Sequence, residues 1–274
     1  MEKLESASLD NRSLLCVGLD PDPRQMPVSD LFEFNRAIID ATADLVCAYK
    51  PNLSFYEAQG IPGLEALKRT VEYIHSTAAR VPVIGDAKRG ELGPSAESYA
   101  KAMFDVWGFD AITANAWGGR ESLQPFFDRE DKGVFVWCRS SNNGAGDIQD
   151  LPVATRDGQR PVFELLAEMA LGWNGNGNVG LVIGATYPLE MKKVRDGCPD
   201  MPFLIPGVGA QGGALEESVR CGANSDGRMA IVSSSRGVLY ASGGSDYAQA
   251  ARQAALVLRE QMNAVLEQEG KGWS

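Results

Sequence analysis

A regular alternation of short apolar runs with longer amphipathic stretches is the feature of this sequence that most constrains its fold. Eight runs have the length and the branched or aromatic residues typical of β-strands: Leu14–Leu19, Val46–Lys50, Val81–Ala87, Ala111–Asn115, Gly133–Cys138, Val179–Gly184, Phe203–Pro206 and Met229–Ser233. Between them, apolar residues at helical spacing predict helices over Leu31–Leu45, Leu64–Ala79, Ser95–Val106, Val162–Leu171, Leu189–Arg195, Ala214–Arg220 and Ser245–Glu269. Strands that alternate with helices form a parallel sheet, because each helix returns the chain to the same edge.

Eight strand–helix units in 274 residues match the size of one α/β barrel, which typically takes about 250 residues. An open, doubly wound sheet would show the same alternation, but it normally carries a glycine-rich dinucleotide fingerprint after its first strand. Here the first strand is followed by Asp20-Pro21-Asp22-Pro23, and no linker rich in Ser or Pro divides the chain. We therefore predict an α/β protein in which residues 1–274 form a single (β/α)8 TIM barrel domain.

Composition restricts the partners of the chain. Its net charge is −10, whereas nucleic-acid surfaces need clustered Lys and Arg to meet phosphate. No apolar run approaches the length of a transmembrane helix, and the opening MEKLE lacks the features of a signal peptide. We expect a cytoplasmic enzyme that takes a small molecule and contacts neither nucleic acid nor membrane.

The cysteines and the single histidine exclude several kinds of chemistry. Five cysteines are widely scattered without a Cys-x-x-Cys pair, so we expect no disulfide framework and no zinc site. His75 lies inside a predicted amphipathic helix, which argues against Ser-His-Asp and Cys-His mechanisms together. The sequence predicts an enzyme that works without a metal and without a redox cofactor.

Polar residues that could do chemistry gather at the carboxyl ends of the predicted strands. In a (β/α)8 barrel this face carries the active site. One such residue alone could merely cap a helix, but seven converge there: Asp20, Lys50, Asp86, Lys88, Asn115, Ser141 and Arg236. The one long irregular stretch, about residues 140–160, follows the fifth strand, and we expect it to be an active-site loop.

The segment Asp86-Ala87-Lys88-Arg89-Gly90-Glu91 ends the third predicted strand. Residues i and i+2 of a strand share a face, so Asp86 and Lys88 should both point into the barrel mouth, with Glu91 just beyond. Burial lowers the pKa of a lysine and adjacent carboxylates raise it, which keeps the Lys88 ammonium charged and able to donate a proton. The alternative is a solvated surface pair, which explains poorly why a lysine ends an apolar strand. Arg89 should point the other way and be structural.

Two loops have the composition of an anion-binding site. The glycine-rich stretch Pro206–Gly213 follows the seventh strand, and Ser233–Gly237, which contains Arg236, follows the eighth. Loops after strands seven and eight form the recurrent phosphate site of these barrels. Each loop alone could be an ordinary tight turn, but together they indicate a phosphorylated substrate.

Taken in order, the motifs resemble the orotidine 5′-phosphate decarboxylase family, and specifically its longer bacterial branch (type 2). The resemblance runs from about Leu15 to Ser242. It rests on Val17-Gly18-Leu19-Asp20, Tyr49-Lys50-Pro51-Asn52, Asp86–Glu91, Cys138-Arg139-Ser140-Ser141-Asn142, Gly184-Ala185-Thr186-Tyr187-Pro188, Pro206–Gly213 and Ser234-Ser235-Arg236-Gly237.

The resemblance implies the reaction and the residues that carry it. The enzyme would convert orotidine 5′-monophosphate (OMP) to UMP and CO₂ in pyrimidine biosynthesis. Lys88 would deliver the proton, Asp86 would press against the substrate carboxylate, and Lys50 would extend the charge network. Members of the family complete their site across a homodimer interface, so Glu91 would come from the partner subunit.

The resemblance also implies how the substrate is held. Asp20 and Lys50 would bind the ribose hydroxyls, and Ser141 would contact the pyrimidine. Gln211 and Arg236 would take the phosphate, and Pro206 belongs to the same binding loop.

This sequence departs from the family pattern at Glu91, where the family has aspartate. The charge is kept, but the side chain is longer by one methylene, and misplacement of a catalytic charge by about 1 Å can reduce a rate roughly 10²-fold. Smaller departures are Ala116-Trp117, where a Pro-Tyr pair is usual, and Asn143, where proline is frequent.

Two alternatives remain open from the sequence. One is a metal-dependent sugar-phosphate decarboxylase or aldol-type lyase on a related barrel, which would need Mg²⁺ ligands. The other is a UMP-binding protein whose catalysis is weakened by Glu91.

Overall fold

Eight parallel strands surround the centre of the molecule in the computed structural model, which describes residues 1–156, 158–209 and 214–273. The strands are β1 (Leu15–Leu19), β2 (Ala48–Pro51), β3 (Ile84–Arg89), β4 (Ala111–Ala114), β5 (Gly133–Arg139), β8 (Val179–Ile183), β9 (Phe203–Ile205) and β10 (Ala230–Ser234). They are hydrogen-bonded in the order β2-β1-β10-β9-β8-β5-β4-β3. A parallel bridge between Tyr49 and Val83 brings the two edge strands β2 and β3 together. The predicted (β/α)8 TIM barrel and its single domain are confirmed, and each strand lies within three residues of its expected ends.

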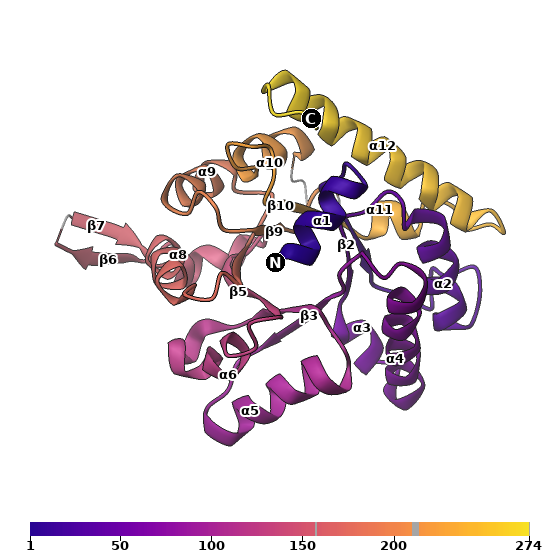
Figure 1. The fold of residues 1–274 in the computed structure, drawn as a ribbon, viewed down its shortest axis with the longest axis horizontal. Helices are drawn as coiled ribbons and strands as arrows, with labels where there is room; N and C mark the ends of the chain where they lie inside the picture. Colours follow the sequence, from indigo (N-terminus) through magenta and orange to yellow (C-terminus); the bar gives the residue numbers. More distant parts are fainter. Residues whose placement is uncertain (157, 210–213, 274) are drawn as a thin grey trace.

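Helices surround this barrel, as Figure 1 shows. The seven predicted helices correspond to α2 (Leu31–Thr42), α4 (Gly60–Thr77), α5 (Gly93–Lys101), α8 (Val162–Trp173), α9 (Pro188–Gly197), α10 (Leu215–Gly222) and α12 (Tyr247–Gln268). The end of the predicted third helix, Ala102–Val106, is a π-helix that continues α5. Short helices that the periodicity did not predict are α1 (Glu2–Asp10), α3 (Leu53–Glu57), α6 (Gln124–Phe127), α7 (Gly146–Gln149) and α11 (Arg236–Leu239).

The hydrophobic core has two parts. One fills the barrel interior, where Cys16, Ile84, Phe135 and Ile231 pack together and Leu4 of α1 joins them. The other lies between the strands and the surrounding helices. Strands covered on both faces read as continuous apolar runs, and β1, β8 and β10 are buried at every position. This packing fixes the strand ends from which the polar residues project.

The stretch at residues 140–160 was expected to be irregular but contains regular elements; its role as an active-site loop stays a prediction. A 3₁₀ turn (Asn143–Ala145) and α7 are followed by an antiparallel hairpin of β6 (Pro152–Thr155) and β7 (Gly158–Pro161). The hairpin projects away from the barrel in Figure 1. Its residues are mostly exposed, so the sequence shows no apolar pattern, and the pairing of the two short strands satisfies the backbone instead.

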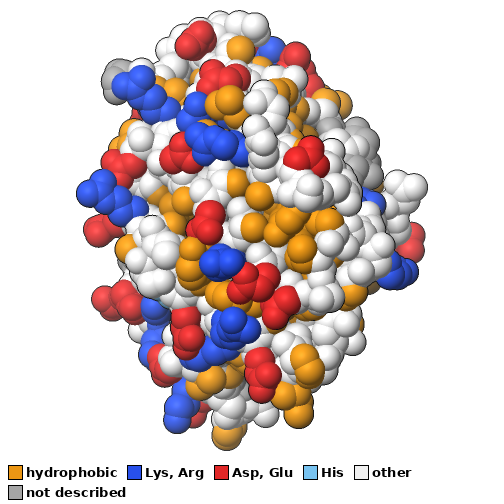
Figure 2. Space-filling view, turned by 90° about the vertical axis from the view of Figure 1, so that its right-hand side faces the viewer, with side chains coloured by type: hydrophobic (Ala, Val, Ile, Leu, Met, Phe, Trp, Pro, Cys, Tyr) orange, Lys and Arg blue, Asp and Glu red, His pale blue; other side chains and the backbone are white. Residues whose placement is uncertain are grey.

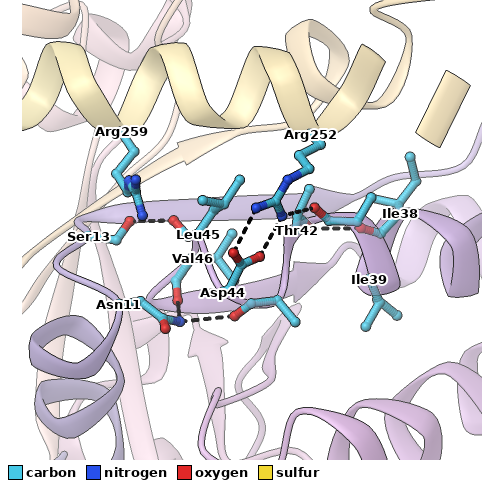
Figure 3. A network of polar contacts seen from close by, with 12 residues as sticks. Asn11, Ser13, Ile38, Ile39, Thr42, Asp44, Leu45, Val46, Arg252 and Arg259 are labelled. Atoms are coloured by element: carbon cyan, nitrogen blue, oxygen red, sulfur yellow. Dashed lines mark hydrogen bonds and ion pairs between the residues drawn. The ribbon is translucent and has the colours of Figure 1, made fainter. Parts of the chain in front are cut away.

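Polar contacts fasten the chain ends to the turn that leads into β2 (Figure 3). The guanidinium of Arg252 on α12 donates to both carboxylate oxygens of Asp44, over 2.6 and 2.8 Å. Asn11, just after α1, donates to two backbone carbonyls of this turn, and the Ser13 hydroxyl donates to the Leu45 carbonyl over 2.7 Å. The first and last helices therefore fix the start of β2.

The surface shown in Figure 2, on the side that carries α2 and α4, mixes acidic and basic side chains with hydrophobic groups between them. This face has no continuous basic area of the kind that binds a phosphate backbone. Within the described part of the chain, no helix is both long enough and apolar enough to span a bilayer.

Candidate active site

A cavity of about 840 Å³ opens at the carboxyl ends of the strands, within the range of pockets that bury small-molecule ligands. Seven of the predicted site residues line it, namely Asp20, Lys50, Asp86, Lys88, Ser141, Pro206 and Arg236. They come from segments as far apart in sequence as β1 and α11. The structure thus brings together side chains that the sequence could only assign to separate strand ends.

Lys50 projects from the end of β2 into the bottom of this cavity, and its side chain is only 6% exposed. Its ammonium lies 3.4 Å from Oδ2 of Asp86. Burial alone would lower the pKa of Lys50, but the Asp86 and Asp20 carboxylates outweigh burial and raise this pKa above its usual value. Lys50 is therefore a fixed positive charge at neutral pH.

Asp86 lies between two ammonium groups. Its Oδ2 faces Lys50, while its Oδ1 accepts a hydrogen bond of 2.6 Å from Lys88 and one of 2.8 Å from the Thr113 hydroxyl. Burial alone would raise the pKa of Asp86, but the Lys50 and Lys88 charges and these hydrogen bonds lower it to about 2. The carboxylate stays ionised throughout the physiological range.

The backbone at Lys88 differs from the regular strand that the sequence suggested. Between the pairs Gly85–Ile112 and Arg89–Ala114, the register of β3 shifts, and Lys88 has a left-handed φ of 46°. For a residue other than glycine this conformation costs about 1–2 kcal/mol. Asp86 and Lys88 do both reach the cavity, but a bulge brings them there, not the simple alternation of a strand. Bulges of this kind are frequent beside active sites, where they re-aim a side chain.

Asp20 follows β1 and is held by two groups that the sequence did not single out. Its Oδ2 accepts a hydrogen bond of 2.6 Å from the Ser235 hydroxyl, and its Oδ1 accepts one of 3.2 Å from the Asn52 amide. A Cβ added at Gly18 would lie 1.9 Å from the Ser235 Oγ. Glycine is therefore required there for the last strand to approach Asp20.

Ser141 is positioned by contacts of its backbone. Its carbonyl accepts a hydrogen bond of 2.9 Å from the Thr186 hydroxyl, and a Cβ added at Gly184 would lie 2.6 Å from its Cα. The preceding residue, Ser140, donates its backbone N–H to the Gln149 side chain on α7 over 2.9 Å. The start of the predicted loop is thus pinned over the end of β5.

The two segments predicted to bind an anion both line the cavity. Arg236 begins α11 just after β10, and Pro206, Gly207 and Val208 line the same cavity after β9. Gly207 has a φ of 100°, which L side chains rarely adopt. Gln211, the other predicted phosphate ligand, lies outside the described residues.

Four residues lie away from this cavity. Asn115 accepts a hydrogen bond from the Trp117 amide, so here the helix-capping alternative is correct. The His75 ring meets the Gly108 carbonyl at 2.9 Å, as expected for a structural histidine. Glu91 is exposed, and its carboxylate accepts a hydrogen bond from the backbone amide of Leu92. The Arg89 guanidinium pairs with the Glu57 carboxylate at 2.6 Å, a structural contact of the kind expected for this residue.

Sequence reasoning missed two inward-facing residues of the central strands. Thr113 on β4 contacts Asp86, and Trp137 on β5 lies with its ring centroid 5.7 Å from the Lys88 ammonium. Both residues line the cavity. Their positions in the predicted strands were available, but periodicity alone does not say which face of a strand points into a barrel.

In residues 1–156, 158–209 and 214–273, no three His, Cys, Asp or Glu side chains come together as they do around a bound metal ion. The described polar groups pair carboxylate with ammonium.

Comparisons with known proteins agree with this geometry. The sequence profile of the orotidine 5′-phosphate decarboxylase / HUMPS family matches residues 13–254. The chain belongs to this family. It is 49% identical over 269 residues to the orotidine 5′-phosphate decarboxylase of Ralstonia pickettii and 48% identical over 264 residues to that of Dehalococcoides mccartyi, covering 96% of this chain and 97% of each relative. The solved structure of Leishmania donovani OMP decarboxylase matches with a TM-score of 0.85 at 39% identity, over 96% of this chain and 97% of that chain.

Membership of the orotidine 5′-phosphate decarboxylase / HUMPS family confirms the resemblance drawn from the motifs. The matches extend over nearly the whole chain, beyond the segments that carry the motifs. The cluster of Lys50, Asp86 and Lys88 therefore lies in the barrel of this family.

Removal of the central carboxylate tests the charge balance of the site. We expect Asp86→Asn to lower the free energy of unfolding by about 3 kcal/mol at pH 7, because it leaves the buried Lys50 ammonium without its nearest counter-charge. The pKa of Asp86 is lowered from 3.8 to about 2. Its contribution to stability is therefore complete above about pH 4 and is lost as the pH falls towards 2.

Urea unfolding at several pH values measures this difference. The matched control is Asp105→Asn, which breaks an exposed pair with Arg129 and should lower the free energy of unfolding by less than about 1 kcal/mol. Equal effects of the two substitutions at pH 7 would contradict the assignment of Asp86 as the neutralising charge.

Proposed function

We propose that this chain converts OMP to UMP and CO₂ in pyrimidine biosynthesis with Lys88 as the proton donor. The observation that carries the proposal is the Asp86 carboxylate held between the Lys50 and Lys88 ammonium groups inside a cavity of about 840 Å³. Relatives that match nearly the whole length of the chain bear the name of this decarboxylase. The enzyme is a carboxy-lyase, and the cytoplasmic location expected from the sequence is part of the proposal.

The chemistry follows from the position of Lys88. When the bond between the ring carbon and the carboxylate breaks, CO₂ leaves and the bonding electron pair remains on the ring carbon. An ammonium next to that carbon stabilises the developing charge and then transfers a proton to it. Lys88 afterwards regains its proton from water, so the cycle needs no oxidant or reductant.

The rest of the cavity binds the nucleotide in this proposal. Asp20 and Lys50 hold the ribose hydroxyls, and Ser141 meets the pyrimidine from the pinned start of the loop at about residues 140–160. Arg236 takes the phosphate, with Pro206 in the neighbouring loop. Gln211 is assigned to the phosphate from the family resemblance alone. Binding energy gained at the phosphate lowers the barrier only where it is stronger in the transition state.

A homodimer is also part of the proposal, because Glu91 does not reach the cavity of its own chain. Two large apolar side chains close to the motif support an interface there. Leu92 is 53% exposed and Trp117 is 82% exposed, and Leu92 lies against Gly118, where an added Cβ would be 3.6 Å from its Cδ2. An interface over this face would bury both and carry Glu91 to the partner's Lys88.

The first test is an assay in EDTA that follows the loss of orotate absorbance. The unaltered chain should turn over OMP in the chelator, whereas a metal-dependent lyase would be inactive and a UMP-binding protein would bind without turnover. Lys88→Ala should lower kcat by more than tenfold, which corresponds to about 1.4 kcal/mol in the barrier. The exposed lysine variant Lys192→Ala serves as the control and should keep full activity; a Lys88→Ala enzyme above a tenth of the unaltered rate would refute the proton-donor assignment.

Arg236→Ala should weaken binding of the phosphorylated substrate and lower kcat/KM, because the guanidinium pairs with phosphate oxygens. The specific signature is that the variant handles the phosphate-free nucleoside as well as the unaltered enzyme does. Steady-state kinetics with both substrates measure this. Equal damage to both substrates would instead mark Arg236 as a structural residue.

Glu91→Ala should depress kcat, because it leaves the charge network of the neighbouring subunit incomplete. Glu91→Asp restores the residue usual in the family and should preserve or raise activity. Kinetics of the two variants, together with sedimentation to verify the dimer, test this assignment. Unchanged kinetics of Glu91→Ala, or a dimer in which Glu91 lies in solvent far from both Lys88 side chains, would overturn it.

A further inference from the structure

Thr113 lies at the point where two neighbouring strands lose their regular register. Along β4 it is the single residue between Ile112 and Ala114, which pair with Gly85 and Arg89 of β3. Opposite this one residue, β3 therefore places three, from Asp86 to Lys88. Such a mismatch leaves backbone groups of the longer strand without partners in the ladder.

The Thr113 hydroxyl forms two hydrogen bonds with this longer segment of β3. Its Oγ1 accepts a hydrogen bond of 3.0 Å from the backbone N–H of Lys88 and donates one of 2.8 Å to Oδ1 of Asp86. Thr113 is 2% exposed, so water does not readily replace either bond. The same Asp86 oxygen accepts the hydrogen bond from the Lys88 ammonium. One hydroxyl thus ties the backbone of Lys88 to the carboxylate that holds its side chain.

We propose that Thr113 is a positioning residue for decarboxylation, whose hydroxyl fixes the Lys88 ammonium and the Asp86 carboxylate relative to each other. The proposal rests on the proposed function, in which Lys88 donates the proton. Lys88 has a left-handed φ of 46°, a conformation that persists only where the surroundings impose it. The hydrogen bond from its N–H to Thr113 is a contact that imposes it.

The placement of Thr113 predicts a specific kinetic defect. The Thr113 hydroxyl bonds to the Lys88 backbone and to Asp86, so its loss should act on this pair and leave nucleotide binding nearly unchanged. Without the Thr113 hydroxyl, the Lys88 ammonium and the Asp86 carboxylate would be held less firmly relative to each other. Electrostatic catalysis depends on charges that are in place before the reaction begins. A change of about 1 Å in such a placement can lower a rate roughly 10²-fold.

The test compares two substitutions at this position. Thr113→Val keeps the branched shape and removes the hydroxyl; we expect kcat to fall about 10- to 100-fold with KM within about threefold of the unaltered value. Thr113→Ser keeps the hydroxyl and should retain kcat within about threefold. Rescue by serine separates a role of the hydroxyl from a role in packing. Should Thr113→Val not fold, Thr113→Ala removes the same hydroxyl and is judged by the same criterion.

The matched control is Thr70→Val in α4, which also removes a buried hydroxyl, hydrogen-bonded to Asn35 and to the Ala66 carbonyl. It should lower thermal stability without changing kcat. The proposal is overturned if Thr113→Val keeps kcat within about threefold, if Thr113→Ser is as impaired as Thr113→Val, or if the loss is entirely in KM. Failure of the proposed function is distinguishable, because the unaltered chain would then not decarboxylate OMP.

Discussion

The site depends on one carboxylate that neutralises two ammonium groups in a largely buried place. Asp86 meets Lys50 at 3.4 Å and Lys88 at 2.6 Å. Without it, the buried Lys50 charge would be strongly unfavourable in a barrel whose interior is otherwise apolar. Charged groups of both signs can therefore coexist at the barrel mouth only because the strand ends hold them within contact distance.

The fold supplies these distances through close approaches of the backbone. Gly18 leaves room for Ser235 to reach Asp20, and Gly184 leaves room for the chain at Ser141. At Lys88 the opposite occurs, since a residue with a side chain adopts a conformation that favours glycine. The backbone strain lies at Lys88, the residue whose ammonium points into the cavity. A hydrogen bond from the Lys88 N–H to Thr113 on β4 helps to hold this conformation.

The sequence predicts the barrel well because its strands are buried on both faces and its helices are amphipathic, so both appear in the hydrophobic pattern. It also predicts Lys50, Asp86 and Lys88, because charged residues at the ends of apolar strands are conspicuous. It does not predict the bulge in β3, which depends on pairing with β4, or the role of Thr113, a residue ordinary for a strand. The hairpin after β5 is not predicted for a related reason, since two exposed strands of four residues each leave no periodic apolar signal.

The distribution of charge in the cavity suits the proposed reaction. Asp86 is ionised at neutral pH because the two lysines lower its pKa, so a substrate carboxylate placed beside it is repelled. The repulsion disappears when that carboxylate leaves as CO₂, whereas the attraction of Lys88 grows as charge develops on the ring carbon. Binding energy from a phosphate held at Arg236 can offset the initial repulsion. In the proposed reaction, the loops assigned to the phosphate and the Lys50–Asp86–Lys88 cluster are thus two parts of one energetic arrangement, and the barrel keeps the distance between them.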